Sequence, residues 1–171
     1  MIQVPLGQQI KPLISPRGGP RNGDVTFTVI GAVPLMPLRI GFGSFEGYEW
    51  IAREQADTDG YFSKVLKVPY WAERDRVHFF FLSRRGGRPH ALSDPFHVTA
   101  PDGTARVIGT LGADAGSCLA LDGPDQTRYS LQGPIHGWAP GTRVLIIGAV
   151  ASEPACEGGG LPISVREIHA A

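Results

Sequence analysis

Cys118 and Cys156 are the residues whose chemistry would change this protein most, because two thiols can form a disulfide, bind a metal or stay free. A structural metal site needs two further ligands nearby, and the sequence contains no CxxC or HxH spacing. The five histidines are scattered along the chain: His78, His90, His97, His136 and His169. The residues predict no metal site and leave two alternatives open, a disulfide and two unrelated buried thiols.

The cysteines and the N-terminal residues point to different compartments. A bridge between Cys118 and Cys156 would close a loop of about 39 residues and stabilise the fold by roughly 4 kcal/mol in the chain-entropy model. A stable bridge implies an oxidising compartment. Residues 1–14, however, lack the basic region and continuous apolar run of a secretory signal. A cytoplasmic location therefore stays open at this point.

Sequence motifs for catalysis are absent. There is no G-x-S-x-G elbow, no S-x-x-K with its supporting motifs, no H-E-x-x-H and no Walker loop. Most carboxylates stand in turn-forming stretches, where Asp shapes the backbone. We therefore expect no catalytic residues and a chain that is not an enzyme.

Two short motifs partly match ligand-binding sequences, one a calcium loop and the other a dinucleotide fingerprint, but neither match is complete. Asp57-Thr-Asp-Gly60 resembles the start of an EF-hand loop, but its glycine comes too early and Leu66 stands where the bidentate Glu is needed. A hairpin turn with Asp-Gly is favoured instead. Gly41-Phe-Gly43 lacks the third glycine of a dinucleotide fingerprint. The sequence therefore predicts no cofactor.

Glycine, proline and charge limit the classes of fold and function. The 171 residues include 23 Gly and 15 Pro, and a helix interior loses about 1 kcal/mol for each Gly and about 3 for each Pro. A helical bundle is therefore excluded. No apolar run approaches the roughly 20 residues that span a bilayer, so no transmembrane segment is expected. A formal net charge of zero argues against a protein built mainly to coat polyanions.

Apolar and polar residues alternate along most of the chain, as they do in β-strands with one buried face. In Asp24–Ile30, every second residue from Val25 is apolar. Arg76–Leu82 is apolar on both faces, and the nearly continuous apolar run Arg143–Val150 predicts a strand buried on both faces. Turn-forming clusters separate these runs at the spacing of all-β sandwiches and barrels.

A change of charge marks a boundary near residue 101. Residues 1–100 hold 12 Lys and Arg against 9 Asp and Glu, a net charge of +3, whereas residues 101–171 hold 4 Arg against 7 Asp and Glu, a net charge of −3. The stretch Thr99–Thr104 is rich in turn-forming residues. We expect an N-terminal segment with a first strand (1–20), the rest of one β domain (21–100) and a second β domain (101–171).

The first part has the pattern of a known type of sandwich. Pro12–Gly31 contains a strand, a Pro/Gly-rich turn and a second strand that ends in glycine; Ala56–Ser63 has a D-x-x-G-x-F-S pattern; and Ser93–Thr99 has the pattern of a closing strand. Together these stretches resemble bacterial immunoglobulin-like domains, which implies an immunoglobulin-like β-sandwich. The Cys–Trp–Cys arrangement of antibody domains is missing, so Trp50 or Trp71 is expected to fill the core.

The sequence of the second part, residues 101–171, predicts five short strands with a connector between the third and the fourth. This is the strand order of an OB-fold. Its recognisable features are Cys118–Leu121, Tyr129-x-Leu131-x-Gly133, Pro140–Val144, Cys156 and Ile163-x-Val165. These features resemble a small bacterial OB-like domain family of unassigned function that is often found in exported proteins. The resemblance implies an OB-like five-stranded barrel, a Cys118–Cys156 disulfide and an extracytoplasmic location, periplasmic or secreted.

Tyr129 and Trp138 are the aromatic residues of the second part and its candidate ligand contacts. OB-folds often bind single strands with stacking aromatics in a basic groove. The alternatives are a half-buried strand residue for Tyr129 and a cap on the barrel end for Trp138. This part is net acidic and has no lysine, which argues against nucleic acid.

The sequence as a whole favours a non-enzymatic extracytoplasmic binding or structural module of bacterial type. Its partner would be an unknown protein or a cell-surface component, and no feature of the sequence names it. The alternative is a single-stranded nucleic-acid-binding OB-fold protein. The charge of residues 101–171 favours the first of these two functions.

Overall fold

The fold is all-β, as the alternation of apolar and polar residues predicts. The computed structural model describes residues 10–84, 87–112, 119–153 and 159–171. Strands make up 55% of these described residues and helix 2%, the latter as one 3₁₀ turn at Pro124–Gln126. Within these described residues, no helix has the length and apolar character needed to cross a bilayer.

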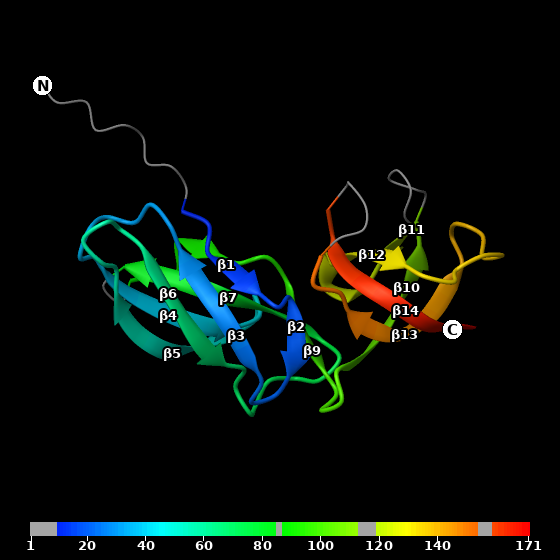
Figure 1. The fold of residues 1–171 in the computed structure, drawn as a ribbon. Coiled ribbons are helices and arrows are strands. Elements are labelled where there is room, and N and C mark those ends of the chain that lie inside the picture. Colours follow the sequence, from blue (N-terminus) through cyan, green and yellow to red (C-terminus); the bar gives the residue numbers. More distant parts are fainter. Residues whose placement is uncertain (1–9, 85–86, 113–118, 154–158) are drawn as a thin grey trace, which may run out of the picture. The chain divides into compact units, whose positions relative to one another are not determined.

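Two sheets form a sandwich-like region that precedes a closed barrel (Figure 1). The first sheet has the order β1-β3-β6 and comprises β1 (Leu13–Ser15), β3 (Asp24–Val29) and β6 (Phe62–Lys67). The second has the order β2-β9-β7-β4-β5 and comprises β2 (Gly18–Pro20), β9 (Phe96–Thr99), β7 (Val77–Arg84), β4 (Pro37–Gly43) and β5 (Tyr48–Gln55). The short strand β8 (Ala91–Leu92) also pairs with β7.

The barrel has the strand order of an OB-fold. Its strands are β10 (Thr104–Leu111), β11 (Leu119–Asp122), β12 (Arg128–Gln132), β13 (Arg143–Val150) and β14 (Leu161–Ala170). The order is β10-β11-β12-β14-β13, and β13 pairs again with β10. Only the β12–β14 pair is parallel. The predicted fold class, an immunoglobulin-like sandwich followed by an OB-like five-stranded barrel, is therefore confirmed.

Contacts along the chain group it into two compact units. Unit 1 contains Met1–Ser15, Val25–Leu66 and Phe79–Asp94, and unit 2 contains Pro16–Asp24, Lys67–His78 and Pro95–Ala171. Unit 2 thus includes residues from both sides of position 101. The ranges 1–20, 21–100 and 101–171 stay a prediction of domain boundaries.

Phenylalanine rings fill the core of unit 1. Phe27 of β3 and Phe42 of β4 both contact Phe80 of β7, with ring centroids 5.9 and 4.9 Å apart. The alternation predicted in β3 is confirmed, since its residues at positions 25, 27 and 29 are buried. The expectation that Trp50 or Trp71 fills the core is wrong, because both are only half-buried and the phenylalanines occupy that space.

The Asp57–Gly60 stretch forms a turn, but not the expected hairpin, because it leads from β5 in one sheet to β6 in the other. The Asp57 carboxylate accepts the backbone N–H groups of Asp59 and Tyr61 at 2.8 and 2.9 Å. Gly60 has a φ of +75°, in the left-handed region that glycine adopts without strain. These carboxylate contacts stabilise the turn.

The prediction that Arg143–Val150 is buried on both faces is wrong. In β13, Val144 and Ile146 are buried, whereas Leu145 and Ile147 are half-buried. A small closed barrel has one interior, which alternate side chains of each strand fill. The residues between them lie on the outside, where they are only partly covered.

A tight turn connects β9 to β10. The Ala100 N–H donates to the Thr104 carbonyl at 2.9 Å, and the Asp102 carboxylate accepts the Thr104 N–H at the same distance. The hydrogen bonds from Thr104 hold the pKa of Asp102 below its ordinary value. Pro101 and Asp102 are exposed at this turn.

Candidate functional site

Strands β4, β5 and β7, with the turn between β4 and β5, carry five aromatic side chains of unit 1 that we call the aromatic face: Phe45, Tyr48, Trp50, Phe79 and Phe81. Four of them flank the glycines of β4. Gly41 pairs with Trp50 on one side and with Phe81 on the other. Gly43 pairs in the same way with Tyr48 and Phe79. Because paired residues point to the same side of a sheet, the four rings share one face.

The glycines allow the rings to lie directly on the backbone of β4. A Cβ atom added at Gly41 would stand 3.3 Å from both Tyr48 Cδ2 and Trp50 Cε3. The Tyr48 ring also contacts the ring of Phe81, with centroids 5.0 Å apart, and that of Trp50, at 5.3 Å and an interplanar angle of 78°. Tyr48 therefore covers the glycine strip and joins the aromatic residues of β5 to those of β7.

A tight turn between β4 and β5 presents the fifth ring. The Ser44 N–H donates to the Gly47 carbonyl at 2.8 Å, and the Ser44 hydroxyl accepts the Glu46 N–H at 3.2 Å. This turn leaves Phe45 at its tip with 74% of its surface exposed. The Phe45 ring lies 4.9 Å from the ring of Phe79.

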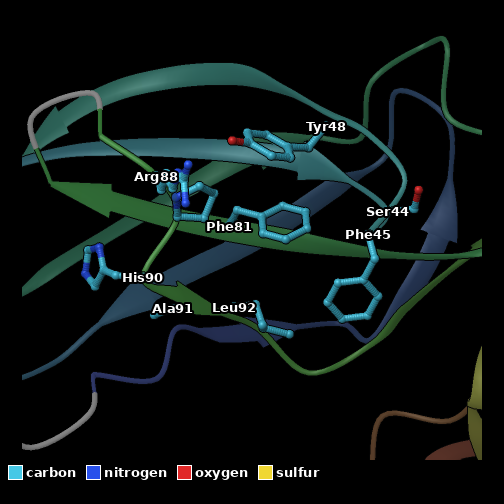
Figure 2. Close-up of a pocket in the computed structure, with 9 residues that line it drawn as sticks. Ser44, Phe45, Tyr48, Phe81, Arg88, His90, Ala91 and Leu92 are labelled. Carbon is cyan, nitrogen blue, oxygen red and sulfur yellow. The ribbon is translucent and has the colours of Figure 1, made fainter.

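A pocket of about 490 Å³ opens on the aromatic face (Figure 2). Its lining residues are Ser44, Phe45, Tyr48, Phe81, Arg88, Pro89, His90, Ala91 and Leu92. Figure 2 shows the rings of Tyr48, Phe81 and Phe45 around the hollow, with Arg88 and His90 toward the end away from Phe45. The volume lies within the range of small-molecule and side-chain binding sites.

Arginine supplies the charge of this surface. Arg39 stands directly opposite Arg53 on the β4–β5 pair, and its Cζ atom lies 4.7 Å from the centre of the Trp50 ring. Like charges in directly opposed positions destabilise a sheet. Among the described residues, no carboxylate forms an ion pair with Arg39, Arg53 or Arg88. The positive charge near the aromatic face is therefore left for solvent or a ligand.

The polar side chains in the pocket lining are those of Ser44, Arg88 and His90. Burial, and then the nearby Arg84 guanidinium, lower the pKa of His90, so its ring is neutral at physiological pH. The Ser44 hydroxyl is engaged with its own turn. Within the described part of the chain, no hydrogen bond joins Ser44 to His90, and no group of three metal-ligating side chains occurs.

Tyr129, a candidate ligand contact from the sequence, lies in the interior of unit 2. It pairs with Leu121 and Leu161, is 1% exposed, and its hydroxyl lies 3.1 Å from Nδ1 of His97. Burial raises the pKa of the Tyr129 phenol. In this position the ring offers no surface on which a ligand could stack.

His97 is a buried titratable group that the sequence did not single out. Its side chain is fully buried, and its Nε2 atom has no hydrogen-bond partner but lies 3.9 Å from Oδ1 of Asp75. Burial lowers the pKa of His97 to about 4; the Asp75 carboxylate opposes this shift and His78 adds to it. The geometry suits a neutral His97 ring whose Nδ1 atom accepts a hydrogen bond from the Tyr129 hydroxyl.

The other sequence-predicted residues lie elsewhere or outside the described residues. Trp138 is half-buried in the connection between β12 and β13, between the turn glycines Gly137 and Gly141. Cys118 and Cys156 lie outside the described residues, so their pairing stays a prediction.

The aromatic face was missed by the sequence reasoning. Tyr48 and Trp50, like Phe79 and Phe81, stand two positions apart, which is also the pattern of a core-facing strand. The signal that could have found the site is Gly41-Phe-Gly43, on the strand that lies between these two aromatic pairs in the sheet. Glycine at alternate positions of a strand marks close approach of another group.

Comparison with known proteins adds no family to this geometry. No family model matches the chain, and no curated protein matches it.

Proposed function

We propose that the chain is a non-enzymatic binding module of bacterial extracytoplasmic type, which holds a partner on its aromatic face. The observation that carries this proposal is the exposure of Phe45 (74%) and Tyr48 (40%) beside a pocket of about 490 Å³. A contiguous exposed aromatic patch marks an interaction site more often than scattered apolar residues do. Aromatic residues and Arg are also enriched at protein interfaces.

Binding without catalysis is supported by the polar groups at the pocket. A nucleophile is activated by a base within hydrogen-bond reach. In the described pocket lining, the Ser44 hydroxyl accepts a backbone N–H from Glu46 and makes no hydrogen bond with His90. Arg88 has no acidic partner among the described ion pairs and suits the recognition of an anionic group.

The location rests on the sequence. The second part resembles an OB-like family that is often found in exported proteins, and Cys118 and Cys156 would pair in an oxidising compartment. We therefore place the module in the periplasm or outside the cell, with a protein or a cell-surface component as its partner.

Single-stranded nucleic acid on the barrel is the less favoured function. OB-folds commonly bind such ligands on the face of their second and third strands, here β11 and β12. On the outer side of this pair, Arg128 and Asp122 stand opposite each other and are exposed, whereas the opposed Ala120 and Ser130 are buried. This part of the surface has no aromatic side chain and no excess of positive charge.

The three tryptophans give a direct test, because they report from different places. Trp50 lies on the aromatic face, Trp71 in the segment between β6 and β7, and Trp138 in the connection after β12. Indole N–H signals of ¹⁵N-labelled protein, assigned with Trp→Phe variants, can be followed during addition of peptides, oligosaccharides or single-stranded oligonucleotides. We expect a binding ligand to shift the Trp50 signal and to leave the Trp138 signal in place.

Matched variants test the same site. Phe45→Ser and Tyr48→Ser should abolish the shift of the Trp50 signal. Tyr70→Ser should leave it unchanged, because Tyr70 is equally exposed, at 75%, but is not part of the aromatic face. A ligand that moves only the Trp138 signal would place binding on the barrel, and a panel in which no class moves the Trp50 signal would refute the proposed function.

A further inference from the structure

We propose that the aromatic face binds an acidic peptide segment and that the pocket receives one apolar side chain of it. This inference rests on the proposed function, because it names the partner class of the same site. Three features of the site support it: the residues that line the pocket, the arginines around it, and the distance between the pocket and these arginines.

The pocket is lined for an apolar side chain. Phe45, Tyr48, Phe81 and Leu92 form most of its wall, and Pro89 and Ala91 complete the apolar part. Such a lining gains from the burial of apolar surface, at about 25 cal/mol per Å². A Phe or Leu side chain of a partner fits within a pocket of this volume and would supply an anchor of the kind that dominates interfaces.

The charge around the pocket fits a partner that carries carboxylates. Arg88 is one of the residues that line the pocket. Arg39 and Arg53 stand opposite each other on the neighbouring strands β4 and β5. A carboxylate between two opposed arginines would relieve their repulsion and accept hydrogen bonds from a guanidinium in bidentate geometry. Glu46 in the β4–β5 turn and Glu49 in β5 are the acidic residues adjacent in sequence to Phe45 and Tyr48.

The same lining argues against a sugar and against nucleic acid. Recognition of several sugar hydroxyls needs convergent polar side chains, whereas the described residues that line this pocket include no carboxylate and no side-chain amide. Bases stack on open aromatic planes, but Tyr48 and Trp50 meet edge to face, at 78°. An apolar anchor with flanking carboxylates is the ligand chemistry that remains.

The spacing of the site matches an extended peptide. Arg39 precedes Gly41 by two residues in β4, which corresponds to about 7 Å along a strand. In an extended peptide, side chains two positions apart have the same separation and point to the same side. An acidic residue two positions from the anchor can therefore reach Arg39 while the anchor occupies the pocket beside Tyr48.

Synthetic peptides test this placement with matched composition. The peptide ESESFSESE places its glutamates on the same side of an extended chain as its phenylalanine, and SESEFESES has the same composition but places them on the other side. We expect the first to bind at least tenfold more tightly in fluorescence anisotropy, to shift the Trp50 indole signal, and to weaken with added salt. Versions with Ala for Phe or Lys for Glu should also bind at least tenfold more weakly.

Charge-reversal variants complete the test. Arg88→Glu and Arg39→Glu should each weaken binding of ESESFSESE at least tenfold, whereas Arg128→Glu, an exposed arginine on β12, should change it less than twofold. The Trp71 and Trp138 signals report whether each variant is folded. Equal binding of the two permuted peptides, or unchanged binding by Arg88→Glu, would overturn the inference. A sugar or oligonucleotide that shifts Trp50 when the peptide does not would overturn it and leave the proposed function standing.

Discussion

Replacing His97 and Tyr129 together by phenylalanine should remove much of the acid sensitivity of the fold. In the wild type, the fully buried His97 ring and the Tyr129 hydroxyl are partners at 3.1 Å. Exchange of both members of a hydrogen-bonded pair for apolar groups of similar shape is close to neutral. The double variant His97→Phe/Tyr129→Phe should therefore fold at neutral pH without leaving a buried hydroxyl unpaired.

The pKa of His97 gives the sign of the effect. Burial lowers this pKa from the ordinary 6.5 to about 4, so the folded state holds the ring neutral where the unfolded chain is protonated. The contribution of the neutral His97 ring to the free energy of unfolding is fully present above pH 6.5. It falls as the pH drops from 6.5 to about 4 and does not change further below that pH. The shift corresponds to about 3 kcal/mol of stability.

Urea unfolding between pH 7.5 and 4.5 measures this contribution. With a urea dependence of about 2 kcal/mol per M for a chain of this size, the wild-type midpoint should fall by about 1 M more than that of the double variant. His78, whose pKa burial also lowers, is retained in both proteins, so its contribution cancels in the comparison. If both proteins lose equal stability on acidification, the assignment of His97 as a neutral buried ring is wrong.

Three further predictions concern the folded state. Gly60→Ala should destabilise the protein by more than about 2 kcal/mol, because its Cβ would meet a backbone carbonyl at a φ of +75°; Gly31→Ala, at +80° in open space, should lose only about 1 kcal/mol. Phe80→Ala should lower the free energy of unfolding by about 3–5 kcal/mol, measured by urea, since this ring is fully buried. Alkylation in denaturant of protein purified without reductant should leave Cys118 and Cys156 unmodified in mass spectra, and modification of both would refute the bridge.

The sequence predicted the fold better than the site, and particular residues show why. Every second residue of β3 from Val25 is apolar, and a single register buries all of them. The five-strand order of the barrel could be inferred because turn-forming clusters separate its strands. In β7, however, both faces carry aromatic rings, so the period of two could not tell the core-facing Phe80 from the outward Phe79 and Phe81.

The buried contact between His97 and Tyr129 in unit 2 also could not be predicted from the sequence. His97 and Tyr129 are 32 positions apart, and no local pattern links them. Tyr129 was singled out as an aromatic residue of an OB-like strand, but the alternation of β12 decides its direction, and Leu121 and Leu161 beside it are fully buried. Placement of a side chain on the inner or outer face needs the register of neighbouring strands, which sequence spacing alone does not fix.

The way the strands pair has a consequence for how the chain folds during its synthesis. All segments of unit 1 have been made once residue 94 has left the ribosome, whereas β14 is the last strand of the barrel to be made and pairs with both β12 and β13. The barrel therefore cannot close while the chain is short of Leu161–Ala170. Until then β12 and β13 expose unpaired backbone edges, and we expect ribosome-bound chains that stop before β14 to be protease-sensitive from β10 onward while Val25–Leu66 is already protected.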